Sequence, residues 1–189
     1  MNRRLQVLLI GSTLLAAWLG MQVVHECGHS LAAWSSGGTV VRVVLAPWTI
    51  SRTDVSPNPH PLFVVWGGPL LGTILPLVAW GLANRLKWRD AFLLRFFAGF
   101  CAIANGVYIG VGSFERIGDA GDMLRHGSPS WTMWLFGAVA VPTGLVLWHR
   151  LGAHFGLGSE PRQITPQSAW GMFGVSLFLV VLGIVVGGR

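Results

Sequence analysis

Five long apolar runs, separated by short polar segments, make up most of the chain. They cover approximately residues 5–34, 61–82, 91–112, 131–148 and 169–187. A helix needs about 20 apolar residues to cross the hydrocarbon core of a bilayer. We therefore expect an all-α membrane protein, a polytopic bundle of about five transmembrane helices that forms a single integral membrane domain over residues 1–189. The lipid bilayer is then the main environment of the protein.

The longest connection, residues 35–60, has a different pattern. Its glycine pair, Gly37-Gly38, interrupts the helical pattern, and β-branched residues follow in a strand-like run over residues 39–46. Three prolines between positions 57 and 61 then favour an extended approach to the second span. We expect a short β-hairpin in this connection, lying against the membrane.

The composition agrees with a membrane location. Hydrophobic residues make up 52% of the chain and charged residues only 11%, whereas soluble domains average about a quarter charged residues. The formal charge is +6, from 13 Lys and Arg against 7 Asp and Glu. These basic residues form no block, which argues against nucleic acid as a partner. The two cysteines, Cys27 and Cys101, lie inside apolar runs, which argues against a disulfide framework.

The basic residues also bear on topology. With five spans, the two termini lie on opposite sides of the membrane. Cytoplasmic connections of membrane proteins carry an excess of Lys and Arg. Here such residues gather at Arg3, Arg4 and the connection around residues 83–90. This distribution favours a cytoplasmic N-terminus, and the first and third spans then both end on the outer side.

The first span carries the strongest chemical motif, His25-Glu26-Cys27-Gly28-His29. Residues four apart lie on one face of a helix, so both imidazoles can reach one metal ion. The glutamate lies about 100° further around the helix, where it can act as general base toward a water on that metal. Ionisable groups at membrane depth are costly and mark functional sites by default. The competing interpretation is a pair of hydrogen-bonded histidines with Glu26 paired to an arginine.

A catalytic zinc site needs a third protein ligand. Because the first and third spans end on the same side, the segment 113–126 can fold back on the two histidines. The acidic and histidine side chains on that side are Asp54, His60, Glu115, Asp119, Asp122 and His126. Asp119 and Asp122 in GDAGD are the favoured ligands, although either can instead cap a short helix. The residues alone leave the choice between them open.

With these motifs the chain resembles the site-2-protease-like membrane metallopeptidases, a family of intramembrane zinc proteases. HECGH is similar to the family's H-E-x-G-H, and Gly67-Gly68-Pro69 to its A-G-P turn in the next span. The segment from Asp119 to Leu124 is similar to the family's L-D-G-G-x-x-L element, whose aspartate completes the zinc site. The resemblance covers roughly residues 20–125, and the family's Asn-x-x-Pro is absent in that form.

The resemblance implies Zn²⁺ held by His25, His29 and Asp119, with Asp122 as the alternative ligand. It also implies Glu26 as general base and substrate contacts from Gly67, Gly68 and Pro69. We expect a zinc-dependent intramembrane endopeptidase that cleaves a transmembrane protein or peptide, in the plasma membrane of a prokaryote. The strand-like run 39–46 can pair with an extended substrate, or can be an ordinary interfacial loop.

Two other functions remain open. The same histidines and aspartate suit a non-proteolytic membrane protein that binds or transports a metal, for which Glu26 would be dispensable. A structural factor that has lost catalysis is the third possibility, against which an intact Glu26 argues. The orientation is also open, because the family's site faces the cytosol and the basic residues here place the motif toward the outer side.

Overall fold

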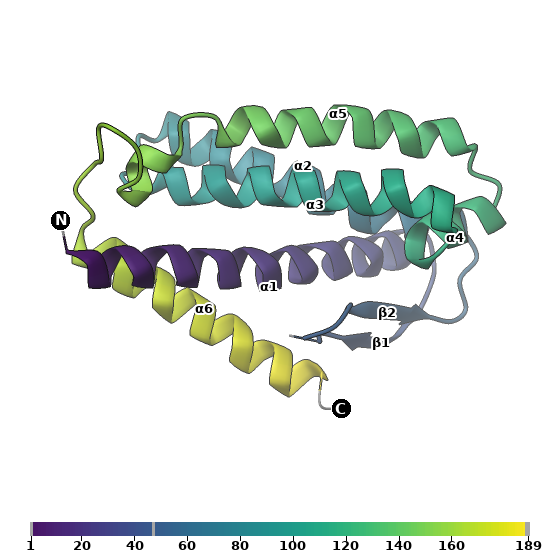
Figure 1. Ribbon diagram of the computed structural model, residues 1–189. Helices are drawn as coiled ribbons and strands as arrows, with labels where there is room; N and C mark the ends of the chain where they lie inside the picture. The colour runs from purple at the N-terminus through teal and green to yellow at the C-terminus, as the bar shows by residue number, and fades with distance from the viewer. Residues whose placement is uncertain (1, 47, 188–189) are drawn as a thin grey trace.

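The computed structural model describes residues 2–46 and 48–187 as a bundle of helices with one small hairpin (Figure 1). In chain order, the elements are α1 (Arg3–Ser35), β1 (Val40–Val44), β2 (Arg52–Val55), α2 (Pro61–Arg85), α3 (Ala91–Glu115), α4 (Gly118–Arg125), α5 (Ser130–Trp148), the 3₁₀ turn η1 (Gly152–Phe155) and α6 (Pro166–Gly187). Five of them, α1, α2, α3, α5 and α6, are long and apolar enough to cross a membrane. The expected bundle of five spans is therefore confirmed, with helix ends that lie up to three residues beyond the apolar runs.

The long helices run side by side, except for α6, which lies obliquely against α1 (Figure 1). α3 packs against both α2 and α5, and α1 packs against α2 and α6. Small residues line these crossings, as is usual in membranes, where helices gain stability from close packing rather than from leaving water. Gly99 of α3 lies against Gly144 of α5, and Gly110 of α3 lies against Gly137 of α5.

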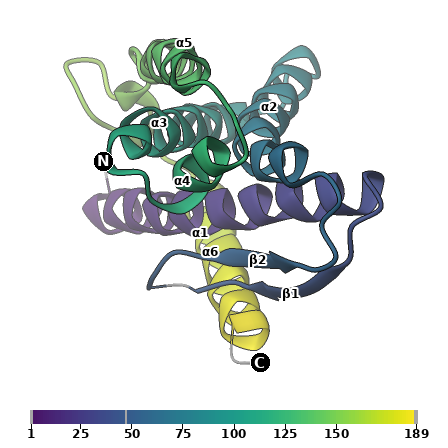
Figure 2. The same cartoon turned by 90° about the vertical axis from the view of Figure 1, so that its right-hand side faces the viewer.

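The expected hairpin forms in the 35–60 connection. β1 and β2 pair in antiparallel fashion, with Val43 opposite Thr53. β2 is the strand next to α1, because Ser51 donates its hydroxyl to Gln22 and Thr53 donates its hydroxyl to Glu26. β1 covers Val40–Val44 of the run 39–46 and lies on the side of β2 away from α1 (Figure 2). The pairing of this run with an extended substrate stays a prediction.

α4 covers the same half of α1 from the other side (Figure 2). The chain reverses after α3 through Arg116 and Gly118, which both have positive φ, at 55° and 53°. Glycine adopts that conformation without penalty, which allows α4 to begin at once. Ala120 and Met123 of α4 are fully buried in a cluster with Ile109. This packing fixes α4 and holds Asp119, at its second position, over α1.

Candidate metal centre

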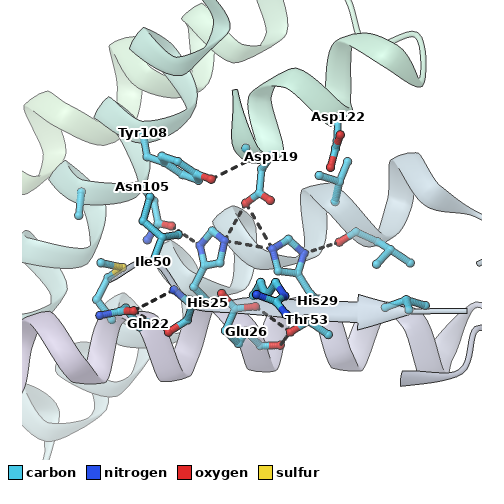
Figure 3. Close-up of a pocket in the computed structure, with 18 of the residues that line it drawn as sticks. Gln22, His25, Glu26, His29, Ile50, Thr53, Asn105, Tyr108, Asp119 and Asp122 are labelled. Carbon is cyan, nitrogen blue, oxygen red and sulfur yellow. Dashed lines mark hydrogen bonds and ion pairs between the residues drawn. The ribbon is translucent and has the colours of Figure 1, made fainter. Parts of the chain in front are cut away.

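Three side chains from two elements converge at the junction of α1 and α4 (Figure 3). His25 and His29 project from α1, and Asp119 projects from α4. Their ligand atoms all lie within 4.8 Å of one another. Nε2 of His25 is 3.0 Å from Nε2 of His29, and Oδ2 of Asp119 is 2.8 Å and 3.3 Å from these two nitrogens. The histidines are buried, each with 7% of its surface exposed.

The outer nitrogens of both imidazoles are held by acceptors, which fixes the ring tautomers. Nδ1 of His25 lies 2.7 Å from Oδ1 of Asn105. The Asn105 amide is oriented by its own Nδ2, which donates to the carbonyl oxygen of Cys101 at 2.9 Å. Nδ1 of His29 donates to the carbonyl oxygen of Val64 at 2.9 Å. Each Nδ1 therefore carries the hydrogen, and each Nε2 offers a lone pair toward the other ring and Asp119.

Two lone pairs and a carboxylate oxygen that face one another repel unless a cation lies among them. A proton on one ring satisfies one of these contacts, whereas a metal ion satisfies all three. The neighbouring helix also leaves room, because an added Cβ at Gly68 would lie 2.8 Å from Nε2 of His25 and nearer still to Nε2 of His29. The donor set, the acceptors that hold the two Nδ1 atoms and this space fit a divalent metal ion.

The surroundings of Asp119 favour its ionised form. Burial alone would raise the pKa of its carboxyl group, but the close contacts with His25 and His29 hold that pKa well below its usual range. The backbone N–H of Asp119 donates to the hydroxyl of Tyr108 at 3.2 Å. The Tyr108 ring lies with its edge toward His25, at a centroid distance of 6.0 Å. These contacts fix the carboxylate against the two histidines.

Glu26 lies beside the three converging groups without joining them. Its side chain is buried, with 4% of its surface exposed. The hydroxyl of Thr53 on β2 donates to Oε2 of Glu26 at 2.7 Å. One carboxylate oxygen is thereby oriented, and the other can accept a proton. Thr53 belongs to no recognisable sequence motif, and it reaches the site only because β2 packs against α1.

A cavity of about 920 Å³ opens beside these groups. Its polar part contains the two histidines, Glu26, Asn105, Tyr108 and Asp119, together with residues 51–55 on and before β2. Its apolar part is lined by Trp18, Met21, Ile50, Ile103 and Val107 of α1, the hairpin and α3. Ile50 and Val107 are exposed on the surface of the bundle. The cavity therefore joins the candidate metal centre to the outer surface of the helices.

The two aspartates of GDAGD have different surroundings. Asp119 contacts both histidines, whereas Oδ1 of Asp122 accepts a hydrogen bond from Arg125 at 2.6 Å. Asp122 and its arginine are largely exposed at the edge of the cavity. The structure thus brings the favoured aspartate to the histidines and leaves the alternative on the surface. The role of Asp119 as a metal ligand stays a prediction.

Gly67, Gly68 and Pro69, which are expected to contact a substrate, lie where α2 crosses α1. None of them lines the cavity among the described residues. A Cβ at Gly67 would lie 2.6 Å from the carbonyl oxygen of Gly28, so this glycine sets the close crossing of α1 and α2. Pro69 is fully buried. This close crossing brings α2 under the histidines, and substrate contacts from these three residues stay a prediction.

Comparison with known proteins identifies no relative. No protein-family description, no curated protein and no solved structure matches this chain. A functional assignment therefore has to be argued from the side chains themselves.

Proposed function

We propose that this protein is a zinc-dependent intramembrane endopeptidase of the site-2-protease-like type. The observation that carries the proposal is the convergence of His25, His29 and Asp119, with Glu26 beside them in one cavity. Two imidazoles and a carboxylate form a donor set typical of catalytic zinc, which keeps a fourth position open. When bound there, zinc supplies a Lewis acid that polarises a water molecule and a substrate carbonyl group.

Glu26 is the proposed general base. It takes one proton from the attacking water while the water oxygen bonds to the carbonyl carbon of the scissile peptide. The proton then passes to the leaving nitrogen as the C–N bond breaks, which restores the carboxylate and balances the hydrolysis. Thr53 orients the carboxylate during both transfers, because its hydroxyl contacts Oε2. Glu26 lines the same cavity as His25, His29 and Asp119 without being one of the three converging groups, which suits this role.

The proposed substrate is a transmembrane protein or peptide. The apolar part of the cavity, at Ile103 and Val107 among others, is suited to apolar side chains that arrive from the bilayer. Proteolysis requires an extended segment, and β2 borders the cavity with residues 52–55. An unwound substrate can add to β2 as a further strand, with backbone hydrogen bonds that do not depend on its sequence. The plasma membrane of a prokaryote is the proposed location.

The decisive experiment compares the wild-type protein with Glu26→Gln after reconstitution into liposomes. Zinc content is measured by inductively coupled plasma mass spectrometry, and cleavage is measured on synthetic transmembrane substrates. We expect both proteins to hold about one zinc ion per chain, and cleavage by the variant to fall at least about a hundredfold. Removal of zinc with a chelator should abolish cleavage by the wild type, and zinc addition should restore it.

Asp122→Asn is the matched control, since it removes a carboxylate from the edge of the same cavity. It should retain both zinc and activity. Cleavage that survives Glu26→Gln would refute the peptidase proposal. Zinc held by both proteins without any cleavage by either would favour the alternative, a non-proteolytic membrane protein that binds or transports metal.

A further inference from the structure

A second polar cluster lies at the end of the bundle that is remote from the candidate metal centre. It consists of Arg95 near the start of α3, His154 in η1 and Arg162 in the segment before α6. Nη1 of Arg162 lies 2.8 Å from Nε2 of His154. Nη2 of Arg95 donates to the carbonyl oxygen of His149, which follows α5, at 3.1 Å. The ring of His154 stacks on Phe92 with an interplanar angle of 19°.

The hydrogen bonds leave two buried donors without partners. A guanidinium group can only donate, so Nε2 of His154 accepts from Arg162 and Nδ1 of the same ring carries the hydrogen. This Nδ1 is buried, and no described residue accepts its hydrogen bond. Nε of Arg95 is buried and equally without an acceptor among the described residues. Buried donors of this kind normally have a partner.

Among the described residues, no acidic group forms an ion pair with the arginines of the cluster. Asp90, which is near in sequence, accepts hydrogen bonds from Ser168 at 2.6 Å and from Arg89 at 3.2 Å, so both of its oxygens are engaged elsewhere. The pKa of His154 is lowered, first by burial and then by the charge of Arg162 and, to a smaller extent, that of Arg95, while an interaction with the Leu151 backbone opposes the shift. The cluster therefore keeps an uncompensated positive potential.

The cluster also lies at the level where lipid headgroups are found. Arg95 is in the second turn of the spanning helix α3, and His149, whose carbonyl oxygen it binds, directly follows the spanning helix α5. Trp148, the last residue of α5, donates its indole N–H to the carbonyl oxygen of Phe96, and tryptophan is enriched at the membrane interface. Guanidinium groups match phosphate oxygens in geometry and charge, and basic pockets between spanning helices bind anionic headgroups.

We propose that Arg95, His154 and Arg162 form a binding site for the phosphate group of an anionic phospholipid. Arg95 and Arg162 supply the positive charge, with Arg162 at the exposed side, whereas Nε of Arg95 and Nδ1 of His154 are buried within the cluster. The acyl chains lie along the apolar surface of α3 and α5. The site is separate from the candidate metal centre, and its existence does not depend on proteolytic activity.

The test measures lipid retention by native mass spectrometry on the protein released from nanodiscs of phosphatidylglycerol mixed with phosphatidylcholine. We expect phosphatidylglycerol to be retained in preference. Arg95→Gln and Arg162→Gln should each weaken that retention about fivefold, since one basic residue near anionic lipid contributes about that factor. Arg85→Gln is the matched control, because it removes the same charge from an exposed position at the same end of the bundle.

Thermal unfolding in detergent identifies the source of the phosphate. A short-chain phosphatidylglycerol should raise the midpoint of wild-type unfolding more than equal concentrations of inorganic phosphate or glycerol phosphate. Arg162 lies in an exposed segment, so Arg162→Gln tests the proposal if Arg95→Gln fails to fold. Equal retention of the two lipids, or equal loss with Arg85→Gln, would overturn the proposal. An equal shift with inorganic phosphate would also overturn it and assign the cluster to a soluble anion.

Discussion

Single side chains decide which aspartate belongs to the candidate metal centre. Asp119 and Asp122 are three residues apart on α4, and both carboxylates are within reach of the cavity. Only Asp119 contacts the histidine nitrogens, and Asp122 is paired with Arg125. The difference arises from the direction of α4, which presents its first turn to α1.

Asp119→Asn should therefore impair metal binding far more than Asp122→Asn. The amide keeps the shape of the side chain but removes the negative charge that the proposed metal ion would need. We expect zinc affinity to fall by more than about a hundredfold in Asp119→Asn, since even outer-shell partners contribute about 10- to 100-fold. Asp122→Asn should stay close to wild type. Competition with a fluorescent zinc chelator measures both affinities, and equal losses in the two variants would contradict the assignment.

Thr53 gives a second prediction at this scale. Its hydroxyl is the hydrogen-bond donor to Oε2 of Glu26, and hydrogen bonds to charged groups contribute about 1.5–3 kcal/mol. Thr53→Val has nearly the same shape and should lower kcat about tenfold to a hundredfold, with KM and zinc content little changed. Thr53→Ser restores the hydroxyl and should recover most of kcat. If serine were as inactive as valine, the hydroxyl would have no part in orienting Glu26.

At the scale of elements, the close crossing of α1 and α2 supports the site. Gly28 lies between the two histidines, and an added Cβ there would overlap the carbonyl oxygen of Gly67 and lie 2.8 Å from Cα of Gly68. Backbone atoms cannot move aside as a flexible side chain can. The crossing also positions Val64, whose carbonyl oxygen holds Nδ1 of His29. Helix spacing and imidazole orientation are therefore linked.

Gly28→Ala should lower both thermal stability and zinc binding. Overpacking a tight contact typically costs about 1–3 kcal/mol, and separation of α1 from α2 would shift His29 relative to Val64. Gly11→Ala is the matched control on the same helix, because nothing lies within 4 Å of a Cβ added there. It should be neutral or slightly stabilising, since alanine favours helix over glycine by about 1 kcal/mol. Thermal unfolding in detergent with and without zinc measures both effects.

The elements also show how far the sequence predicts the site. Apolar length predicts the five spans because the bilayer fixes it, and the i, i+4 spacing predicts that His25 and His29 share a helix face. Because consecutive spans cross the membrane in opposite directions, the first and third spans end on the same side. This predicts that the segment with Asp119 returns to His25 and His29. The orienting roles of Asn105 and Thr53 depend on tertiary contacts between elements far apart in sequence. The packing role of Gly67 and Gly68 likewise becomes visible only when α1 and α2 are placed together.

For the molecule as a whole, charge is divided unequally between the two ends of the bundle. The end with the N-terminus carries the basic residues Arg3, Arg4, Arg85, Lys87, Arg89, Arg95, Arg150 and Arg162, with the acids Asp90 and Glu160. The end with the candidate metal centre carries, among the described residues, Arg42, Arg52, Arg116 and Arg125, with the acids Glu26, Asp54, Glu115, Asp119 and Asp122. Among the described residues, eight Lys and Arg therefore lie at the first end and four at the second.

This asymmetry predicts that the N-terminal end lies in the cytoplasm and that the candidate metal centre opens toward the outside. That orientation is opposite to the one that the resemblance to site-2 proteases implies, so a measurement can separate the two. Ser56→Cys lies next to the hairpin, and Ser159→Cys lies in the segment after η1, both at exposed positions. Each is introduced with Cys27 and Cys101 replaced by serine. A membrane-impermeant maleimide should label Ser56→Cys in intact cells and Ser159→Cys only after permeabilisation. The reverse labelling pattern would place the candidate metal centre toward the cytosol. In that case the contacts around the site, and not the distribution of Lys and Arg, would determine the orientation of the protein in the membrane.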